Sequence, residues 1–382
     1  MVPNKSSRGL LIGLIVAHVF GTLIAYTVYI KFSSLGDGYL PESYEAVREL
    51  YEGQLSSTIF VWAIYYYVGK VFPFFLAPMF FGLIIAILIW NAFRNVYIYT
   101  GRKLFWVCNL FPHFLIWSGT SSKEQIVIIC GIIIINFVAR HLFSSRKSKI
   151  SLFYAIIALG IVLLIRPNYF VIYFTIFITA FSAPLLNKII TERLSAGVWF
   201  VAFILSITLL TLVLTLHETF FSTDVIDWMQ KTQYSFLAYT TSGSNRTDIQ
   251  WNDLYDFFYN SLWGMPQGFI GPTFKEILSK PIQAPVFLEG VVYLLIISYL
   301  LYKLIQLAKS YRSLRVHLFP FIFVGFCIIF VSYPYLIFNP GAALRYKQSL
   351  HPLLVFYPLL ILAYIRAKNF TNTHFKKESN TN

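Results

Sequence analysis

The sequence predicts an all-α fold: a polytopic bundle of transmembrane helices with one large external loop. Of the 382 residues, 57% are hydrophobic and only 12% are charged, whereas a typical soluble domain carries about 25% charged residues. Apolar runs close to the roughly 20 residues that cross a bilayer recur along the chain. The 30 Lys and Arg residues exceed the 16 Asp and Glu and gather in alternate connections between these runs. This basic excess indicates membrane topology and not a nucleic-acid partner.

Ten apolar runs are long enough, or nearly so, to count as spans, and they make residues 1–382 a single transmembrane domain. The segment 57–71 is not counted, because Lys70 and Pro73 separate it from the next run. Its tyrosines fit an interfacial helix at the level of the lipid headgroups better than an eleventh span. The ten runs are 9–30, 72–93, 104–117, 124–143, 151–165, 169–186, 197–216, 287–307, 315–337 and 350–365.

A turn separates the runs 151–165 and 169–186. One continuous helix over both would have about 35 residues and a length of roughly 52 Å, which is too long for a single crossing. The residues between the runs, Arg166-Pro167-Asn168, are a turn signal. We therefore expect a tight helical hairpin here.

Charge predicts the orientation of the ten spans. One set of connections, which includes both termini, holds 19 of the 30 basic residues and only two acids, Glu192 and Glu378. Basic residues collect in cytoplasmic loops, so both termini are expected in the cytoplasm. The acidic loop 31–57, with its juxtamembrane helix, and the large loop 217–286 are then external.

Asp37 is the most distinctive residue of the external loop 31–57. It stands in a Gly-Asp-Gly turn, so the backbone can direct its carboxylate towards a molecule at the membrane surface. An ordinary turn aspartate is the alternative, and both interpretations stay open at this point.

The other distinctive external residues are basic or lie next to basic residues. Lys123 and Glu124 open a span, at a place where the helix dipole favours glutamate but not lysine. Arg166 ends a span, and Arg345 follows a Pro-Gly turn shortly before the last span, with His351 at the start of that span. Arginine inside hydrocarbon costs up to about 3 kcal/mol, so each arginine needs a partner or reaches the headgroups. Anion binding and snorkelling to the headgroups are the two interpretations.

The large loop 217–286 is rich in aromatic residues, including Trp228, Trp251 and Trp263. They lie either at the membrane interface or in flat platforms for the apolar faces of sugars. The sequence holds no phosphate-binding P-loop and no HExxH motif, and its three cysteines show no CxxC spacing.

Several of these residues together resemble a known family. An N-terminal span followed by the external Asp37, the stretch Phe111-Pro112-His113, the turn Leu164-Ile165-Arg166-Pro167 and the late pair Arg345-Tyr346 look like polytopic GT-C-type glycosyltransferases. Membrane proteins of bacterial surface-polysaccharide synthesis, including repeat-unit polymerases, look much the same. The likeness is one of pattern over most of the chain. Two features depart from it, since the first loop has no paired acids and no sizeable soluble C-terminal domain is present.

The resemblance implies an activity, its substrates and a site. A sugar on a polyprenyl phosphate or diphosphate would be transferred, with inversion, to a glycan or lipid acceptor on the outer face of the plasma membrane. Asp37 would be the general base, and basic side chains would bind the phosphate that leaves. No cofactor is required, and a divalent Mg or Mn ion stays open. The substrate- and phosphate-binding set is Lys123, Glu124, Arg166, Arg345, Tyr346 and, as a weaker member, His351.

Three other functions stay open. A repeat-unit polymerase uses the same lipid-linked donor, but its acceptor is another lipid-linked glycan. A flippase or transporter for lipid-linked sugars commonly shows internal repeats and charged residues within spans, and this sequence shows no such repeat and almost no such charges. A structural scaffold subunit is the third. If Arg345 binds phosphate, Arg345→Lys should be harmful, whereas Lys347→Arg is expected to be tolerated.

Overall fold

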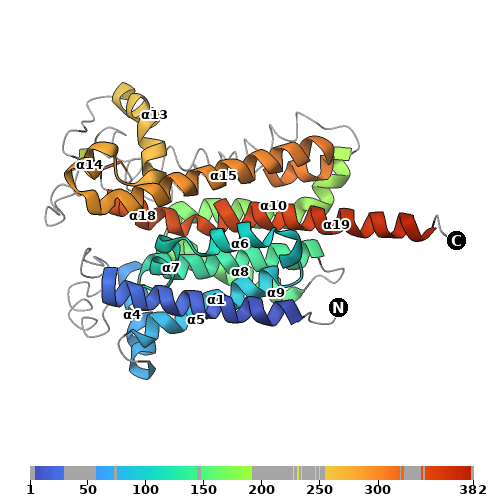
Figure 1. The fold of residues 1–382 in the computed structure, drawn as a ribbon, viewed down its shortest axis with the longest axis horizontal. Helices are drawn as coiled ribbons and strands as arrows, with labels where there is room; N and C mark the ends of the chain where they lie inside the picture. The colour runs from blue at the N-terminus through green and yellow to red at the C-terminus, as the bar shows by residue number, and fades with distance from the viewer. Residues whose placement is uncertain are drawn as a thin grey trace. The chain divides into compact units, whose positions relative to one another are not determined.

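In the computed structural model the part of the chain that the structure describes is almost all helical (Figure 1). No strand occurs among the residues that the structure describes, which agrees with the predicted all-α class. Asp37 and almost all of the loop 31–57 lie outside the described part of the chain. The described residues are 5–29, 57–72, 75–143, 148–191, 227, 230–231, 234, 246, 249, 254–318, 320–321, 337–338 and 340–379.

The chain divides into two compact units, each with its own helices and its own buried polar cluster. The first unit contains residues 1–166 and 348–382, and the second contains residues 167–347. The first unit is built from α1 (Lys5–Ile24), η1 (Ala25–Tyr29), α4 (Ser57–Val71), α5 (Leu76–Phe93), η3 (Tyr97–Tyr99), α6 (Arg102–Asn109), α7 (Pro112–Ser118), α8 (Lys123–Phe143), α9 (Lys149–Ile165), η8 (Pro352–Phe356) and α19 (Tyr357–Ser379).

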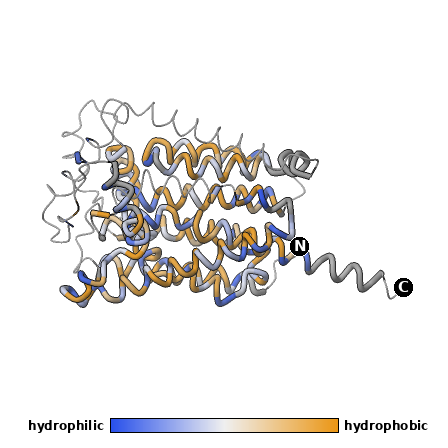
Figure 2. The backbone as a smooth tube through the Cα atoms, turned by 90° about the horizontal axis from the view of Figure 1, so that it is seen from above, coloured by the Kyte–Doolittle hydropathy of each residue, from blue (hydrophilic) through white to orange (hydrophobic). Residues whose placement is uncertain are grey.

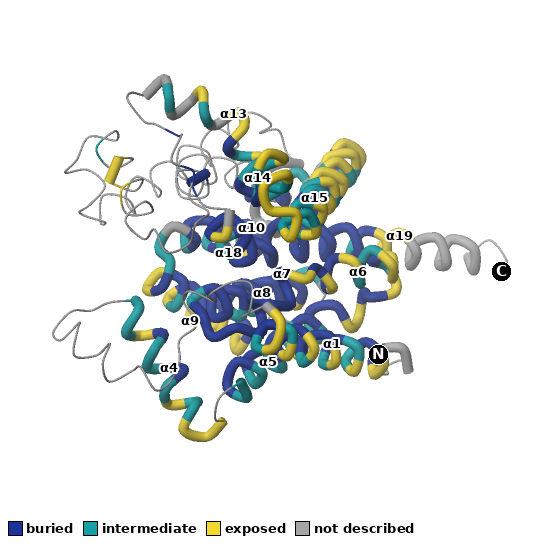
Figure 3. Tube along the Cα trace, turned by 60° about the vertical axis from the view of Figure 1, so that its left-hand side comes forward, coloured by how far each residue is buried: buried dark blue, intermediate teal, exposed yellow. Residues whose placement is uncertain are grey.

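The central helix of the first unit is α8. It packs against α5, α9 and η8, and 72% of its apolar segment is buried, so the helix is dark blue over most of its length in Figure 3. The helix α8 carries apolar residues on all of its faces, as expected for a helix that is surrounded by other helices. In the second unit only 22% of the apolar segment of α15 (Ala284–Ser310) is buried. Exposed apolar side chains such as Leu288, Val292 and Leu295 therefore suit a lipid environment. Hydrophobic residues predominate along much of the helical backbone in Figure 2.

In the first unit α1 and α9 run in one direction, and α5 and α8 run in the opposite direction. Near the beginning of α1, Trp90 Nε1 at the end of α5 donates a hydrogen bond to Ser7 O over 2.8 Å. At the other end, Gln125 Nε2 at the start of α8 donates to Pro78 O at the start of α5 over 2.9 Å. Arg166, which follows α9, contacts Glu124 at the start of α8. The ends of α1 and α9 therefore lie with the starts of α5 and α8.

The predicted span 104–117 is divided into two short helices, α6 and α7, with a break at Leu110 and Phe111. The ring of Pro112 disfavours a helical backbone at the residue before it, and Phe111 accordingly has φ −57° and ψ 121°. The two pieces still follow α1 in its own direction. A Cβ added to Gly13 would meet Trp106 of α6, and one added to Gly21 would meet Leu115 of α7.

Within the described ranges, four helical segments are long and apolar enough to cross a membrane, and a bent pair of helices makes a fifth if it counts as one span. Two more apolar helices, Lys149–Ile165 and Tyr169–Ser182, are shorter. The predicted run 197–216 and most of 315–337 fall outside the described residues, so the count of ten stays a prediction. The four segments are Ser7–Val28, Leu76–Phe93, Lys123–Leu142 and Pro281–Ser310, and the pair is Gly341–Ser349 with Pro352–Asn369.

The segment 57–71 forms the helix α4, which at 15 residues is short for a crossing. Val61 and Tyr65 are buried, whereas Tyr67 and Val71 are largely exposed. The ammonium of Lys70 lies 4.4 Å from the centre of the Tyr66 ring. Such a helix has the mixed character of an interfacial segment, and its place in the interface stays a prediction.

The predicted break at Arg166-Pro167-Asn168 is confirmed. The helix α9 ends at Ile165, Arg166 has φ −145° and ψ 75°, and α10 begins at Pro167. Proline suits the first position of a helix, where its missing N–H is not needed. The second unit then consists of α10 (Pro167–Thr191), α13 (Leu254–Ile270), α14 (Phe274–Ser279), η5 (Pro281–Gln283), α15, η6 (Arg312–Leu318) and α18 (Pro340–Ser349).

In the second unit α13 packs against α15 at Gly290, and this contact leaves no room for a side chain. A Cβ added to Gly290 would lie 2.2 Å from Ile270 O, so Gly290→Ala must separate the two helices. We expect it to lower the free energy of unfolding by about 1–3 kcal/mol, measured by denaturation in detergent micelles. Gly160→Ala is the matched control, because nothing lies within 4 Å of its added Cβ. Equal stability of both variants would contradict the close packing.

Candidate functional site

A buried polar cluster surrounds the start of α8 in the first unit. Between Glu52 and Glu192 the chain has a single acidic residue, Glu124, and its side chain is completely buried. The connection that leads into α8, residues 118–122, is polar and equally buried. A carboxylate deep inside a membrane protein is costly unless it has a partner, and it then commonly marks a functional site.

The partner of Glu124 is Arg166. Its Nη2 donates to Glu124 Oε1 over 2.6 Å, and 24% of the arginine side chain is exposed. Glu124 also lies in the first turn of α8, where the helix dipole stabilises a negative charge. Ser122 supplies the N-cap, because its Oγ accepts the N–H of Gln125 over 3.2 Å. Two sequence-predicted residues, Glu124 and Arg166, therefore form one ion pair.

Lys123 lies beside this pair and is tied to the beginning of α4. Its ammonium donates hydrogen bonds to Ser57 Oγ over 3.0 Å and to Thr58 Oγ1 over 2.9 Å. The half-buried ammonium is thus held by hydroxyl groups. Lys123 and Arg166 together carry one positive charge more than Glu124 neutralises.

Gln125 connects several helices directly behind the ion pair. Its Oε1 accepts a 2.6 Å hydrogen bond from Tyr65 of α4, and its Nε2 donates to Pro78 O of α5 and to Ser118 O of α7. All polar atoms of this amide are used in the buried interior, which gives the start of α8 a unique position.

The polar face of α1 completes the cluster. His18 Nδ1 and Ser118 Oγ are 2.9 Å apart, and Tyr26 donates to Ser121 Oγ over 3.5 Å. His18 and Thr22 of α1 and Tyr26 of η1, which continues α1 directly, are spaced four residues apart, so they follow one side of this helical segment. This stripe of polar residues in an otherwise apolar run is a sequence signal from which the cluster could have been predicted.

His351 has an aromatic environment in the same unit. Its completely buried ring stacks on Phe114, with centroids 4.1 Å apart, and meets Phe111 and Phe356 edge to face. These contacts give His351 a packing role. Its phosphate role stays a prediction.

The end of the first unit opposite to Glu124 is basic. It comprises the beginnings of α1, α6 and α9 and the ends of α5 and α8, together with the middle of α19. In the described part of this end the charged side chains are basic and exposed: Arg8, Arg94, Arg102, Lys103, Arg140, Lys149, Arg366 and Lys368.

Arg345 and Tyr346 belong to the second unit, where they form a stacked pair on α18. The guanidinium carbon of Arg345 lies 4.6 Å from the centre of the Tyr346 ring, and Nη2 donates to the Tyr346 hydroxyl over 2.8 Å. Tyr169 of α10 donates to the carbonyl of Tyr346 over 3.3 Å. The half-buried guanidinium is therefore held flat against an aromatic face.

Lys347 differs from the sequence-based expectation. Only 1% of it is exposed, and its ammonium donates to Phe269 O over 2.8 Å and lies 5.2 Å from the Tyr293 ring centre. Phe269 is in the last turn of α13, whose carbonyls lack helical partners and attract cations. A larger guanidinium in this buried position would have to displace its neighbours. The burial of Lys347 therefore weighs against the expected tolerance of Lys347→Arg.

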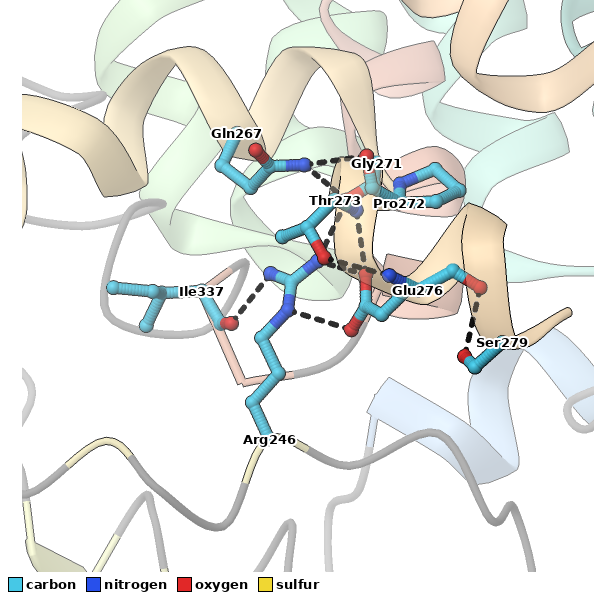
Figure 4. A network of polar contacts seen from close by, with 8 residues as sticks. All are labelled: Arg246, Gln267, Gly271, Pro272, Thr273, Glu276, Ser279 and Ile337. Carbon is cyan, nitrogen blue, oxygen red and sulfur yellow. Dashed lines mark hydrogen bonds and ion pairs between the residues drawn. The ribbon is translucent and has the colours of Figure 1, made fainter. Parts of the chain in front are cut away.

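The buried Arg246 was not singled out by the sequence, yet its side chain makes four hydrogen bonds in the second unit (Figure 4). Its guanidinium grips Glu276 with two hydrogen bonds, from Nε to Oε1 and from Nη2 to Oε2, each 2.9 Å long. Burial alone would raise the pKa of Glu276, but the hydrogen bonds from Arg246 and Thr273 and the charge of Arg246 outweigh it and lower this pKa. The stabilisation by the carboxylate is therefore present at neutral pH and lost as the pH falls through the lowered pKa.

Within the described residues no three His, Cys, Asp or Glu side chains gather in a way that could hold a metal ion. The candidate base Asp37 lies outside those residues. Comparison with known proteins gives no guide to the function, since no family model, no curated protein and no solved structure matches the chain.

Proposed function

We propose that the protein is a membrane glycosyltransferase that uses a sugar linked to a polyprenyl phosphate or diphosphate. It transfers this sugar, with inversion, to a glycan or lipid acceptor on the outer face of the plasma membrane. The observation that carries the proposal is the partly exposed Arg166 held by the buried Glu124, with Lys123 beside it.

This arrangement suits a phosphate group. A guanidinium carries five N–H donors in a rigid fork and can bind two phosphate oxygens at once. Glu124 restrains the Arg166 guanidinium through a charge-assisted hydrogen bond before any ligand arrives, which reduces the entropic cost of binding. The excess positive charge of Lys123 and Arg166 would then balance the charge that develops on the leaving phosphate.

The reaction needs a base as well as a cationic site. In our proposal the acceptor hydroxyl oxygen attacks the anomeric carbon and forms the new glycosidic bond, while the bond from that carbon to the phosphate oxygen breaks. Asp37 takes the hydroxyl proton. A Mg or Mn ion would add positive charge at the phosphate.

The orientation is part of the proposal. It assumes about ten spans in a GT-C-like arrangement, both termini in the cytoplasm and the Glu124 end outside. The exposed basic residues at the opposite end of the first unit support it, because basic residues collect on the cytoplasmic side. A cysteine placed at Ser148, near that basic end, should therefore react with a membrane-impermeant thiol reagent only after the cells are opened. Labelling of intact cells would reverse the orientation.

The decisive experiment is transfer by purified protein in lipid nanodiscs. Radiolabelled sugars on polyprenyl phosphate and on polyprenyl diphosphate are supplied with a glycan or a lipid acceptor, with and without Mg²⁺. Transfer of one sugar to the added acceptor supports the proposal. A ladder of products from a lipid-linked oligosaccharide alone would instead indicate the polymerase. No product from any donor would refute both.

Arg345→Lys tests the second candidate phosphate contact. The variant keeps the charge but loses the fork and the flat stacking on Tyr346. We expect donor affinity to fall about tenfold, the cost of roughly 1.4 kcal/mol, measured as KM for the donor. The exposed Lys275→Arg in the same unit is the control. An unchanged KM in Arg345→Lys would leave Arg345 as an ordinary interfacial residue.

A further inference from the structure

The helix α18 is attached to the rest of the second unit at both of its ends. Before it, the carbonyl of Ile337 accepts a 2.8 Å hydrogen bond from Arg246 Nη1, and the carbonyl of Phe338 accepts the backbone N–H of Arg246, also over 2.8 Å. Near its end, Lys347 binds Phe269 O. Arg345 therefore lies on a helix whose two flanks are fixed by buried cations.

Both attachments lead to the end of α13. Lys347 binds a carbonyl of its last turn, and Arg246 Nη2 binds the carbonyl of Gly271, the next residue after the helix, over 2.7 Å. Gly271 has a φ of +93°, and a Cβ there would come within 3.0 Å of Leu344 of α18. Only glycine combines that backbone conformation with so close a neighbour.

Arg246 is suited to hold these segments and is not suited to bind substrate. It is 7% exposed, and Glu276 neutralises its charge through two hydrogen bonds. Glu276 is itself fixed, because its Oε2 accepts the backbone N–H of Thr273 over 2.6 Å in the capping box of α14. A single guanidinium thus joins α14, the end of α13 and the residues before α18 (Figure 4).

We propose that Arg246 is a positioning residue for Arg345 and Tyr346. By holding the carbonyls of residues 337, 338 and 271, it places the first turns of α18 and hence the guanidinium that is offered to the phosphate. The phosphate role of Arg345 rests on the function proposed above, whereas the placement of α18 by Arg246 does not. A lysine could not replace Arg246, since an ammonium cannot grip a carboxylate and two separate carbonyls in one plane.

Two measurements on the full chain in nanodiscs test this proposal. The first is hydrogen–deuterium exchange of peptides covering 340–349, with peptides of α8 as the internal reference. The second is the affinity of the folded protein for undecaprenyl phosphate, used as the probe for a lipid-linked phosphate. Arg246→Gln and Arg246→Lys are compared with Lys275→Gln. This control removes one exposed charge from α14, the helix that carries Glu276. Glu276→Gln is a milder variant in case the substitutions at Arg246 prevent folding.

We expect exchange in 340–349 to rise at least tenfold in both Arg246 variants and to rise less in Glu276→Gln, with α8 unchanged. Affinity for the probe should fall about tenfold, and Arg246→Gln combined with Arg345→Lys should lose less than the sum of the two single variants. Lys275→Gln should match the wild type in both measurements. A merely structural role would reduce the amount of folded protein without this coupling to Arg345.

The outcomes separate the two proposals. Unchanged exchange of 340–349 in folded Arg246→Gln, or in Glu276→Gln if the Arg246 variants do not fold, overturns the positioning role. Increased exchange with full additivity of the affinity losses also overturns it, because Arg246 would then not act through Arg345. If the wild type does not bind undecaprenyl phosphate, the phosphate role of Arg345 fails while increased exchange still supports the placement of α18.

Discussion

Glu124→Gln is expected to lower the free energy of unfolding by about 2–3 kcal/mol. Removing one partner of a buried ion pair typically costs about 3–5 kcal/mol, and the partial exposure of Arg166 reduces this figure. The glutamine keeps the shape of the side chain but leaves the guanidinium of Arg166 without a counter-charge. The measurement is unfolding in mixed detergent micelles followed by tryptophan fluorescence. Donor affinity should fall as well, since the carboxylate no longer restrains Arg166.

A double variant shows whether the loss comes from the ion pair. Glu124→Gln combined with Arg166→Met removes both charges and should recover at least half of the lost stability, because no buried charge is then left unpaired. Lys149→Gln, an exposed charge at the opposite end of the first unit, should leave stability unchanged. A Glu124→Gln protein as stable as the wild type would mean that the pair does not hold α8 and α9 together.

Asp37→Asn is expected to reduce the turnover of sugar transfer by about 10²–10⁴-fold, the usual effect of losing a general base. Asparagine keeps the size of the side chain and its place between two glycines but cannot take the proton of the acceptor hydroxyl. The initial rate of transfer at saturating donor is the measurement, normalised to folded protein. KM for the donor should change little, because the proton acceptor does not bind the phosphate.

Glu45→Gln in the same external loop is the matched control for Asp37→Asn. It removes one negative charge from the segment 31–57 and should keep turnover within about threefold, because glutamates are mostly exposed to water. If Asp37→Asn also stays within that range, the base lies elsewhere. A loss of equal size in both variants would indicate an electrostatic effect of the loop.

Local signals predicted much of the first unit. The break at Arg166-Pro167 follows from the geometry of proline, and the start of α8 coincides with the polar residues that cap it. The division of the segment 104–117 into two helices could also be predicted from the sequence, because Pro112 disfavours a helical backbone at Phe111. Hydropathy alone does not reveal this break, since the apolar run continues through the proline.

The hydrogen-bond partners of the buried cations in the second unit could not be predicted from local sequence patterns. Arg246 binds groups 25, 30 and 91 residues away in the chain, and Lys347 binds a carbonyl 78 residues away. The spacing of residues along the sequence does not predict such pairs, because they depend on how distant helices pack together. Lys347 and Arg345 are only two residues apart, yet one is sealed inside and the other remains half-exposed. The two side chains project from different faces of α18, and this difference in helix face determines their burial.

The polar face of α1 also has a consequence for biogenesis. His18 and Tyr26 find their partners 100 and 95 residues later in the chain, and translation at roughly 5–20 residues per second makes that an interval of about 5–20 s. During this time α1 must stay in the bilayer with polar groups that have not yet met Ser118 and Ser121. Its early insertion therefore depends on the surrounding apolar residues and on shelter from the insertion machinery. Slow translation between α1 and α7 would prolong this exposed stage and favour degradation of the nascent chain.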